Sequence, residues 1–130
     1  MSGTPGKILV AEDNPALAAV IKFNLQQAGH QVMVVNDGQA ALETAQLESF
    51  DMIVTDHQMP NLSGVEFCER LRDLKAYQAT PILMLTAKAL EMDFADLQER
   101  LGLCQLLAKP FSPAEVVRVV AENLAPATID

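Results

Sequence analysis

The stretch "DMIVTDHQMPNLSG" (residues 51–64) decides the fold, because it joins a short apolar segment to a turn and to a helix start. Residues 52–55, "MIVT", are mostly apolar and include three apolar residues in succession, which is typical of a strand covered on both faces. This strand delivers Asp56 to the edge of a turn that contains Met59-Pro60 and Gly64. Because a carboxylate is costly to bury without a partner, Asp56 is expected either to cap the turn or to take part in chemistry.

Similar apolar stretches occur four more times, separated by amphipathic segments: "KILVA" (7–11), "QVMVV" (31–35), "PILMLT" (81–86) and "CQLLA" (104–108). Together with 52–55 they predict five strands with apolar residues on both faces. Strands of this kind form parallel sheets that helices cover on both sides.

The segments between the strands carry helix signals, either a capping side chain or apolar residues at helical spacing. Asn14-Pro15 and the two capping boxes Ser63/Glu66 and Ser112/Glu115 are the clearest of them. Helices are predicted to begin after Asn14, Asp37, Ser63 and Ser112, and a further helix is predicted to be lined by Leu90, Phe94, Leu97 and Leu101. The predicted fold class is therefore α/β, a doubly wound five-stranded parallel sheet with helices on both faces and the flavodoxin-like strand order 2-1-3-4-5.

Length and composition limit the function. The 130 residues suit one domain, residues 1–130, with an ordered core of about 7–124. The net charge of −8, from 17 acidic and 9 basic residues, disfavours direct binding to nucleic acid. The sequence has no apolar run near the ~18 residues that a membrane span needs. With no signal-peptide pattern either, we expect a cytoplasmic protein that does not contact a membrane, and its two cysteines are expected to be free thiols.

Polar residues follow four of the predicted strands. Glu12-Asp13 follow the first strand, Asp56 the third, Thr86 the fourth and Lys109 the fifth. In a parallel sheet these strand ends lie on one edge, where such folds bind ligands. We therefore expect three carboxylates, one hydroxyl and one ammonium group to converge there.

Three neighbouring carboxylates either share a proton or are neutralised by a cation. An all-oxygen set of this kind suits Mg²⁺, and no Cys or His spacing suits zinc. Asp56, already an anion at neutral pH, can attack phosphorus without a general base, with Lys109 and Thr86 binding the phosphoryl oxygens. In the simpler alternative, Asp56 only caps a turn and Lys109 only forms a salt bridge.

The chain resembles the receiver domain of two-component response regulators, in particular receiver domains like those of chemotaxis regulators. The resemblance is carried by "LVAEDNP" (9–15), by residues 51–64, by "PILMLTA" (81–87) and by "LLAKPF" (106–111). It implies that Asp56 is the phosphoacceptor of a histidine-to-aspartate phosphorelay, and that Thr86 and Lys109 bind the phosphoryl group. It also implies that Mg²⁺ is held by four residues, Asp13 and Asp56 directly, Glu12 mostly through water, and Gln58 by its backbone carbonyl.

The resemblance further implies a cis Lys109–Pro110 bond and a phosphohistidine donor on a histidine kinase or histidine phosphotransfer protein. A downstream protein or an output domain would read the change. In this interpretation the chain is not an enzyme, because it catalyses only its own phosphorylation and dephosphorylation. The resemblance also implies that Gln58 and Lys88 occupy positions that, in this family, tune how long the phosphoryl group persists.

One position departs from the family. Three residues before the lysine, where the family usually has Tyr or Phe, this chain has Leu106. The hypothesis is that the signal passes through Thr86 and the loop after it, without aromatic gating. Two rival functions stay open. The first is a pseudo-receiver that only binds proteins, which Leu106 favours. The second is a Mg²⁺-dependent phosphohydrolase with an aspartate nucleophile, which is disfavoured because such enzymes usually need an acidic residue at the position of Gln58.

Overall fold

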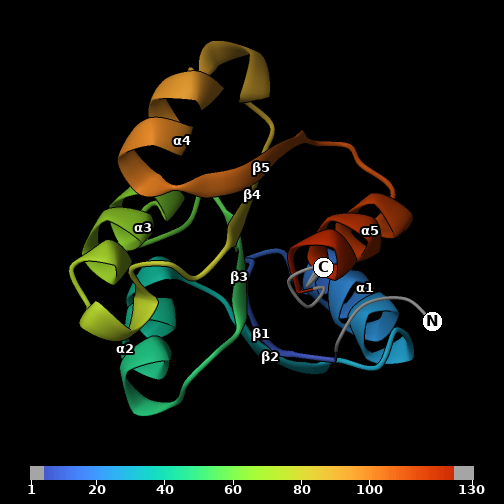
Figure 1. Ribbon diagram of the computed structural model, residues 1–130. Coiled ribbons are helices and arrows are strands. Elements are labelled where there is room, and N and C mark those ends of the chain that lie inside the picture. The colour runs from blue at the N-terminus through green and yellow to red at the C-terminus, as the bar shows by residue number, and fades with distance from the viewer. Residues whose placement is uncertain (1–4, 125–130) are drawn as a thin grey trace, which may run out of the picture.

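Five parallel strands form a single sheet in the computed structural model, which describes residues 5–124 (Figure 1). The order β2-β1-β3-β4-β5 confirms the predicted fold class. The strands are β1 (Lys7–Ala11), β2 (Gln31–Val35), β3 (Met52–Asp56), β4 (Ile82–Thr86) and β5 (Leu103–Ala108).

Helices cover both faces of the sheet. They are α1 (Pro15–Gln27), α2 (Gly38–Leu47), α3 (Gly64–Arg72), α4 (Phe94–Leu101) and α5 (Pro113–Leu124), with two 3₁₀ turns, η1 (Lys75–Tyr77) and η2 (Ala89–Glu91). Figure 1 shows α1 and α5 together on one side of the sheet, and α2, α3 and α4 on the other. Each connection passes from a strand through a helix to the next strand, as parallel pairing requires.

The sheet divides the interior into two apolar cores. Within β1, Leu9 and Ala11 belong to the core under α2, α3 and α4, whereas Ile8 and Val10 belong to the core under α1 and α5. Alternate side chains of a strand point to opposite faces, so each central strand contributes to both cores. This explains why the strands are apolar at successive positions.

The predicted caps are present. The Asn14 side chain accepts hydrogen bonds from the first turn of α1, and the Asp37 carboxylate accepts one from the Ala40 N–H (2.7 Å). Ser63 and Glu66 form the predicted capping box at α3. These caps satisfy backbone N–H groups that have no partner within the helix.

The prediction that Leu90 lines a helix with Phe94 is wrong. Helix α4 begins at Phe94, because the Asp93 side chain accepts a hydrogen bond from the Asp96 N–H (3.1 Å) and caps the helix there. Leu90 lies in the separate turn η2, and its side chain is fully exposed. A local cap therefore overrides the apolar spacing.

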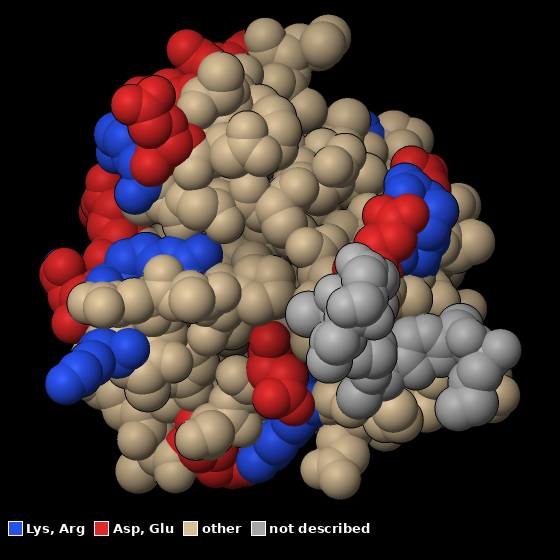
Figure 2. All heavy atoms as spheres, viewed as in Figure 1, with Lys and Arg blue, Asp and Glu red and all other residues tan. Residues whose placement is uncertain are grey.

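Some surface charges lie beside charges of opposite sign. On the face shown in Figure 2, basic and acidic side chains occur in mixed groups rather than in one broad basic patch. Arg100 pairs with Asp96 (2.9 Å) and Arg118 with Glu122 (3.1 Å), each one helical turn apart. Such exposed pairs contribute little to stability.

Cys68 is buried and Cys104 half-buried, and both are free, as predicted. Burial raises the pKa of the Cys68 thiol to about 12 and that of Cys104 to about 11, so neither forms a thiolate readily. Among residues 5–124, no helix combines the length and apolar character that crossing a bilayer requires.

Candidate functional site

The carboxyl ends of the strands gather an ion-paired cluster. The Lys109 Nζ lies 2.9 Å from Asp56 Oδ2 and 3.3 Å from Glu12 Oε1. Carboxylate oxygens of Glu12, Asp13 and Asp56 lie within 4.8 Å of one another. Residues up to 97 positions apart in the sequence thus meet at the edge where the sequence predicts a site.

Backbone hydrogen bonds at the strand ends hold these side chains in place. The Glu12 N–H donates to the Val35 carbonyl (3.0 Å), which continues the β1–β2 pairing by one residue. The Lys109 N–H donates to the Thr86 carbonyl (2.9 Å) in the same way beside β4. The Lys109–Pro110 peptide bond is cis, as the resemblance implies. The cluster is therefore built on the rigid sheet rather than on free loops.

Two of the three carboxylates are buried, and Lys109 is half-buried. Glu12 and Asp56 are 1% and 3% exposed, whereas Asp13 is exposed and borders solvent. Asp56 Oδ1 is buried without any hydrogen-bond partner among the described residues. An unpaired carboxylate oxygen is costly to bury, so the site is short of one cationic or hydrogen-bonding ligand. Three carboxylates with one free oxygen fit a small hard cation such as Mg²⁺.

Burial and like charge shift the proton affinity of Glu12. Desolvation raises the pKa of its carboxyl to about 7, and the Asp56 charge adds to this rise. The hydrogen bond from the Asn14 N–H (3.1 Å) and the Lys109 charge act in the opposite direction. Burial by itself lowers the pKa of Lys109, but the hydrogen bond and charge of Asp56, with Glu12, outweigh it and raise that pKa. Lys109 is therefore a permanent cation here.

A pH dependence of stability follows from Glu12. Between pH 4.5 and about 7 the folded protein keeps a proton on Glu12 that the unfolded chain has lost, so its contribution to stability falls as pH rises through this window. We expect metal-free protein to lose about 1–3 kcal/mol from this group between pH 5 and 8. Urea unfolding in chelator at both pH values measures the loss, which Glu12→Gln should remove. Equal pH dependence in both proteins would contradict this assignment.

Thr86 is fully buried, and its hydroxyl oxygen accepts a hydrogen bond from the Lys88 N–H (2.9 Å). Its hydroxyl therefore already contacts the loop that leads to η2. Leu106 is half-buried beside the core of α2, α3 and α4 and pairs with Met84 in the sheet. Because residue 106 is a leucine, no aromatic ring is present at this position of β5.

Gln58 follows β3 with an exposed side chain, and no described donor bonds to its backbone carbonyl. Its carbonyl is thus available to a ligand. Sequence reasoning missed the Asn14 backbone N–H, which holds Glu12 in place. No side-chain pattern could have indicated this role, because every residue other than proline carries the same donor.

Comparison with known proteins gives this site its context. Residues 8–121 match the family described as "Response regulator receiver domain". The chain is 43% identical over 110 residues to the alkaline phosphatase synthesis transcriptional regulatory protein PhoP of Bacillus subtilis, covering 85% of this chain and 45% of that protein. It thus spans less than half the length of that curated relative.

Two solved structures are also similar. The chemotaxis response regulator CheY4 of Vibrio cholerae has a TM-score of 0.83 and 33% identity, over 93% of this chain and 100% of that one. The receiver domain of the sensor histidine kinase PA1611 of Pseudomonas aeruginosa PAO1, solved with a magnesium ion in its active-site cleft, has a TM-score of 0.82 and 33% identity, over 93% and 98% of the two chains.

The fold and the site define a doubly wound α/β protein with a cluster of three carboxylates and one lysine at the carboxyl edge of its sheet. The chain belongs to the response regulator receiver domain family. It is a phosphoacceptor domain of two-component signalling.

Proposed function

We propose that Asp56 accepts the phosphoryl group from a phosphohistidine on a histidine kinase or histidine phosphotransfer protein. The observation that carries this proposal is the Asp56 carboxylate itself, buried at a strand end, with Oδ2 bound to Lys109 (2.9 Å) and Oδ1 without a partner. A carboxylate oxygen attacks phosphorus as the P–N bond breaks, and the electron pair of that bond returns to the imidazole ring. The product is an aspartyl phosphate.

Lys109 and Thr86 bind the phosphoryl oxygens in this proposal. Lys109 is a half-buried cation that balances the charge that develops on the transferring group. Thr86 has a hydroxyl proton to donate, since its oxygen uses only an acceptor position in the bond from Lys88. A phosphoryl group that binds Thr86 would then change the hydrogen bonding of the loop that leads to η2. Because residue 106 is a leucine and not an aromatic residue, we propose that the signal passes through this loop.

Mg²⁺ is the proposed cofactor, held by Asp13, Asp56 and the Gln58 carbonyl, with Glu12 acting mostly through water. When bound, it would neutralise the carboxylates and the phosphoryl oxygens. The carboxylates within 4.8 Å of one another and the free Asp56 oxygen support this assignment, as does the magnesium ion in the similar Pseudomonas domain. Glu12 is a buried carboxylate of this cluster, whereas Asp13 is its exposed carboxylate.

We further propose that residues 1–130 form one cytoplasmic receiver domain that catalyses only its own phosphorylation and dephosphorylation. A downstream protein or an output domain reads the change. Intact Asp56 and Lys109 argue against a pseudo-receiver, since their ion pair is formed. A phosphohydrolase is disfavoured because Gln58 supplies no acid two positions after the acceptor.

Asp13→Ala tests the metal and the phosphorylation together. We expect this variant to bind Mg²⁺ at least ~10-fold more weakly and to lose phosphorylation in parallel, since it loses one anionic ligand of a hard cation. Calorimetric titration with MgCl₂ and intact-mass analysis after acetyl phosphate measure the two effects. Asp73→Asn, at the far end of α3, is the control. Normal phosphorylation of Asp13→Ala would contradict the assignment of Asp13.

A further inference from the structure

The N-terminal end of α2 lies against the loop that follows Asp56. Gly38, the first residue of α2, is buried, and a methyl group added to it would overlap the carbonyl oxygen of Leu62. The same methyl group would lie 2.8 Å from the carbonyl carbon and from the Cβ of Leu62, closer than folded proteins tolerate. Helix and loop therefore approach backbone to backbone at this point.

Space, rather than backbone conformation, explains the glycine at position 38. Gly29 and Gly102 have φ angles of 101° and 69°, which other residues adopt with strain, whereas Gly38 is the first residue of a regular helix. Alanine is favoured over glycine in helices by about 1 kcal/mol. Helix propensity therefore gives glycine no advantage over alanine here, and its small size is what the contact with Leu62 requires.

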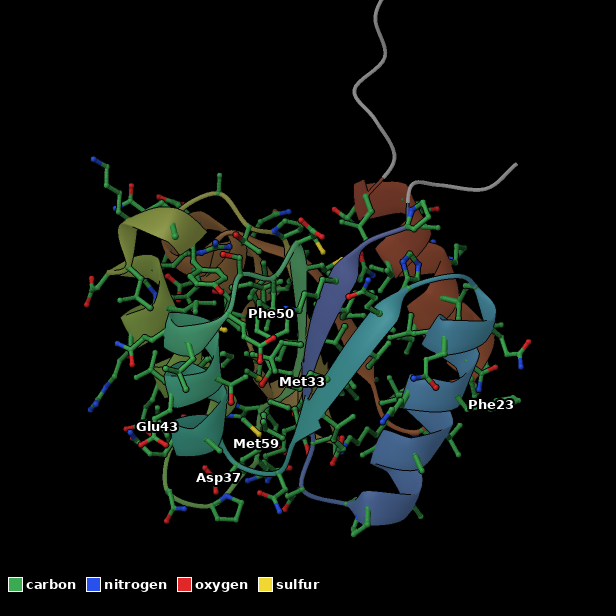
Figure 3. The ribbon with its side chains drawn as sticks, turned by 90° about the horizontal axis from the view of Figure 1, so that it is seen from below. Phe23, Met33, Asp37, Glu43, Phe50 and Met59 are labelled. Carbon is green, nitrogen blue, oxygen red and sulfur yellow. The ribbon has the colours of Figure 1, made fainter. Side chains whose placement is uncertain are left out.

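The loop that Gly38 contacts, residues 57–63, is a compact turn closed by backbone hydrogen bonds. Asn61 has a left-handed φ of 70°, and the Leu62 N–H donates to the Pro60 carbonyl (2.8 Å). At its other end the Gly64 N–H donates to the His57 carbonyl (2.7 Å). In Figure 3, Asp37 of the α2 cap and Met59 of this loop lie at the same end of the molecule.

The same loop carries the Gln58 carbonyl. Leu62 is 5% exposed and belongs to the same core as Ala41 and Leu42 of α2, so the loop cannot shift away without disturbing that core. We infer that Gly38 is a positioning residue of the metal site, which acts through Leu62 and its turn on the Gln58 carbonyl. The inference rests on the proposed function, because it uses Gln58 as a metal ligand. Helix α2 thereby controls a site to which it contributes none of the assigned ligands.

Gly38→Ala tests this inference. We expect its Kd for Mg²⁺ to rise about 10-fold, which is the usual effect of replacing a residue that holds a metal ligand in position. In metal-free protein, the Gly64 amide, which bonds across the loop, should exchange its hydrogen faster than in the wild type. Calorimetry with MgCl₂ and amide hydrogen exchange measure the two effects.

Gly102→Ala is the matched control. It places alanine at a φ of 69°, at the C-terminal end of α4, where the added methyl would lie 3.1 Å from Arg72. It should lower the urea midpoint and leave the Kd for Mg²⁺ and the exchange of Gly64 unchanged. This separates loss of positioning from loss of stability.

Each outcome decides the inference. A Gly38→Ala protein that folds and retains the wild-type Kd overturns it. If Gly38→Ala does not fold, Leu62→Val, which shortens the buried side chain that holds the loop in the core, must weaken Mg²⁺ binding, and an unchanged Kd overturns the inference. If the wild type itself binds no Mg²⁺, the proposed metal site fails, while Gly64 exchange still shows whether Gly38 positions the loop.

Discussion

Asp56→Asn is expected to reduce phosphoryl incorporation to the level of a blank reaction. The amide is not an anion at neutral pH and cannot take the place of the carboxylate as nucleophile. Its shape is the same, and it removes one of the like charges beside Glu12, so the variant should fold. Lys109 keeps Glu12 as a partner at 3.3 Å. Intact-mass analysis after acetyl phosphate and MgCl₂ measures the loss, and peptide mapping of the wild type should place the adduct on residue 56.

The same variant separates chemistry from stability. Without metal at pH 8, Asp56→Asn should unfold at a urea concentration equal to or higher than the wild type, because the crowded carboxylates repel each other less. Phosphorylation of the Asn variant at the wild-type rate would show that another residue is the acceptor. The adduct would then have to be mapped among the remaining acidic side chains.

Lys109→Met is expected to slow phosphorylation about 10²-fold, the usual size of the loss when one group that stabilises developing negative charge is removed. Binding of Mg²⁺ should persist or strengthen, because the ammonium group that competes with the metal for Asp56 and Glu12 is gone. Stopped-flow phosphorylation and calorimetry give the two quantities. Lys75→Met, at an exposed position in η1, is the matched control.

The metal-free form of Lys109→Met should also be less stable at pH 8. Breaking a fully buried ion pair costs about 3–5 kcal/mol, and we expect about 2 kcal/mol here because the Lys109 side chain is 24% exposed. Saturating MgCl₂ should restore most of this loss. A variant that phosphorylates at the wild-type rate would remove Lys109 from the site.

Local sequence determined the elements of this fold with little ambiguity. The strands are apolar at successive positions because each one is covered on both faces, and Asn14, Asp37 and Ser63 cap helices as their side chains predict. Helix α4 was the exception: apolar spacing extended it to Leu90, although the Asp93 cap is equally visible in the sequence. Two local signals competed, and the side-chain hydrogen bond prevailed.

The sequence by itself also determined which side chains share the site, because parallel strands must bring their carboxyl ends to one edge. Only the tertiary structure decided how these groups interact. The pairing of Lys109 with both Asp56 and Glu12, the raised pKa of Glu12 and the unpaired Asp56 oxygen depend on burial and on distances between residues far apart in the chain. The contact of Gly38 with Leu62 likewise has no local signature, because it arises where two separately specified elements meet in space.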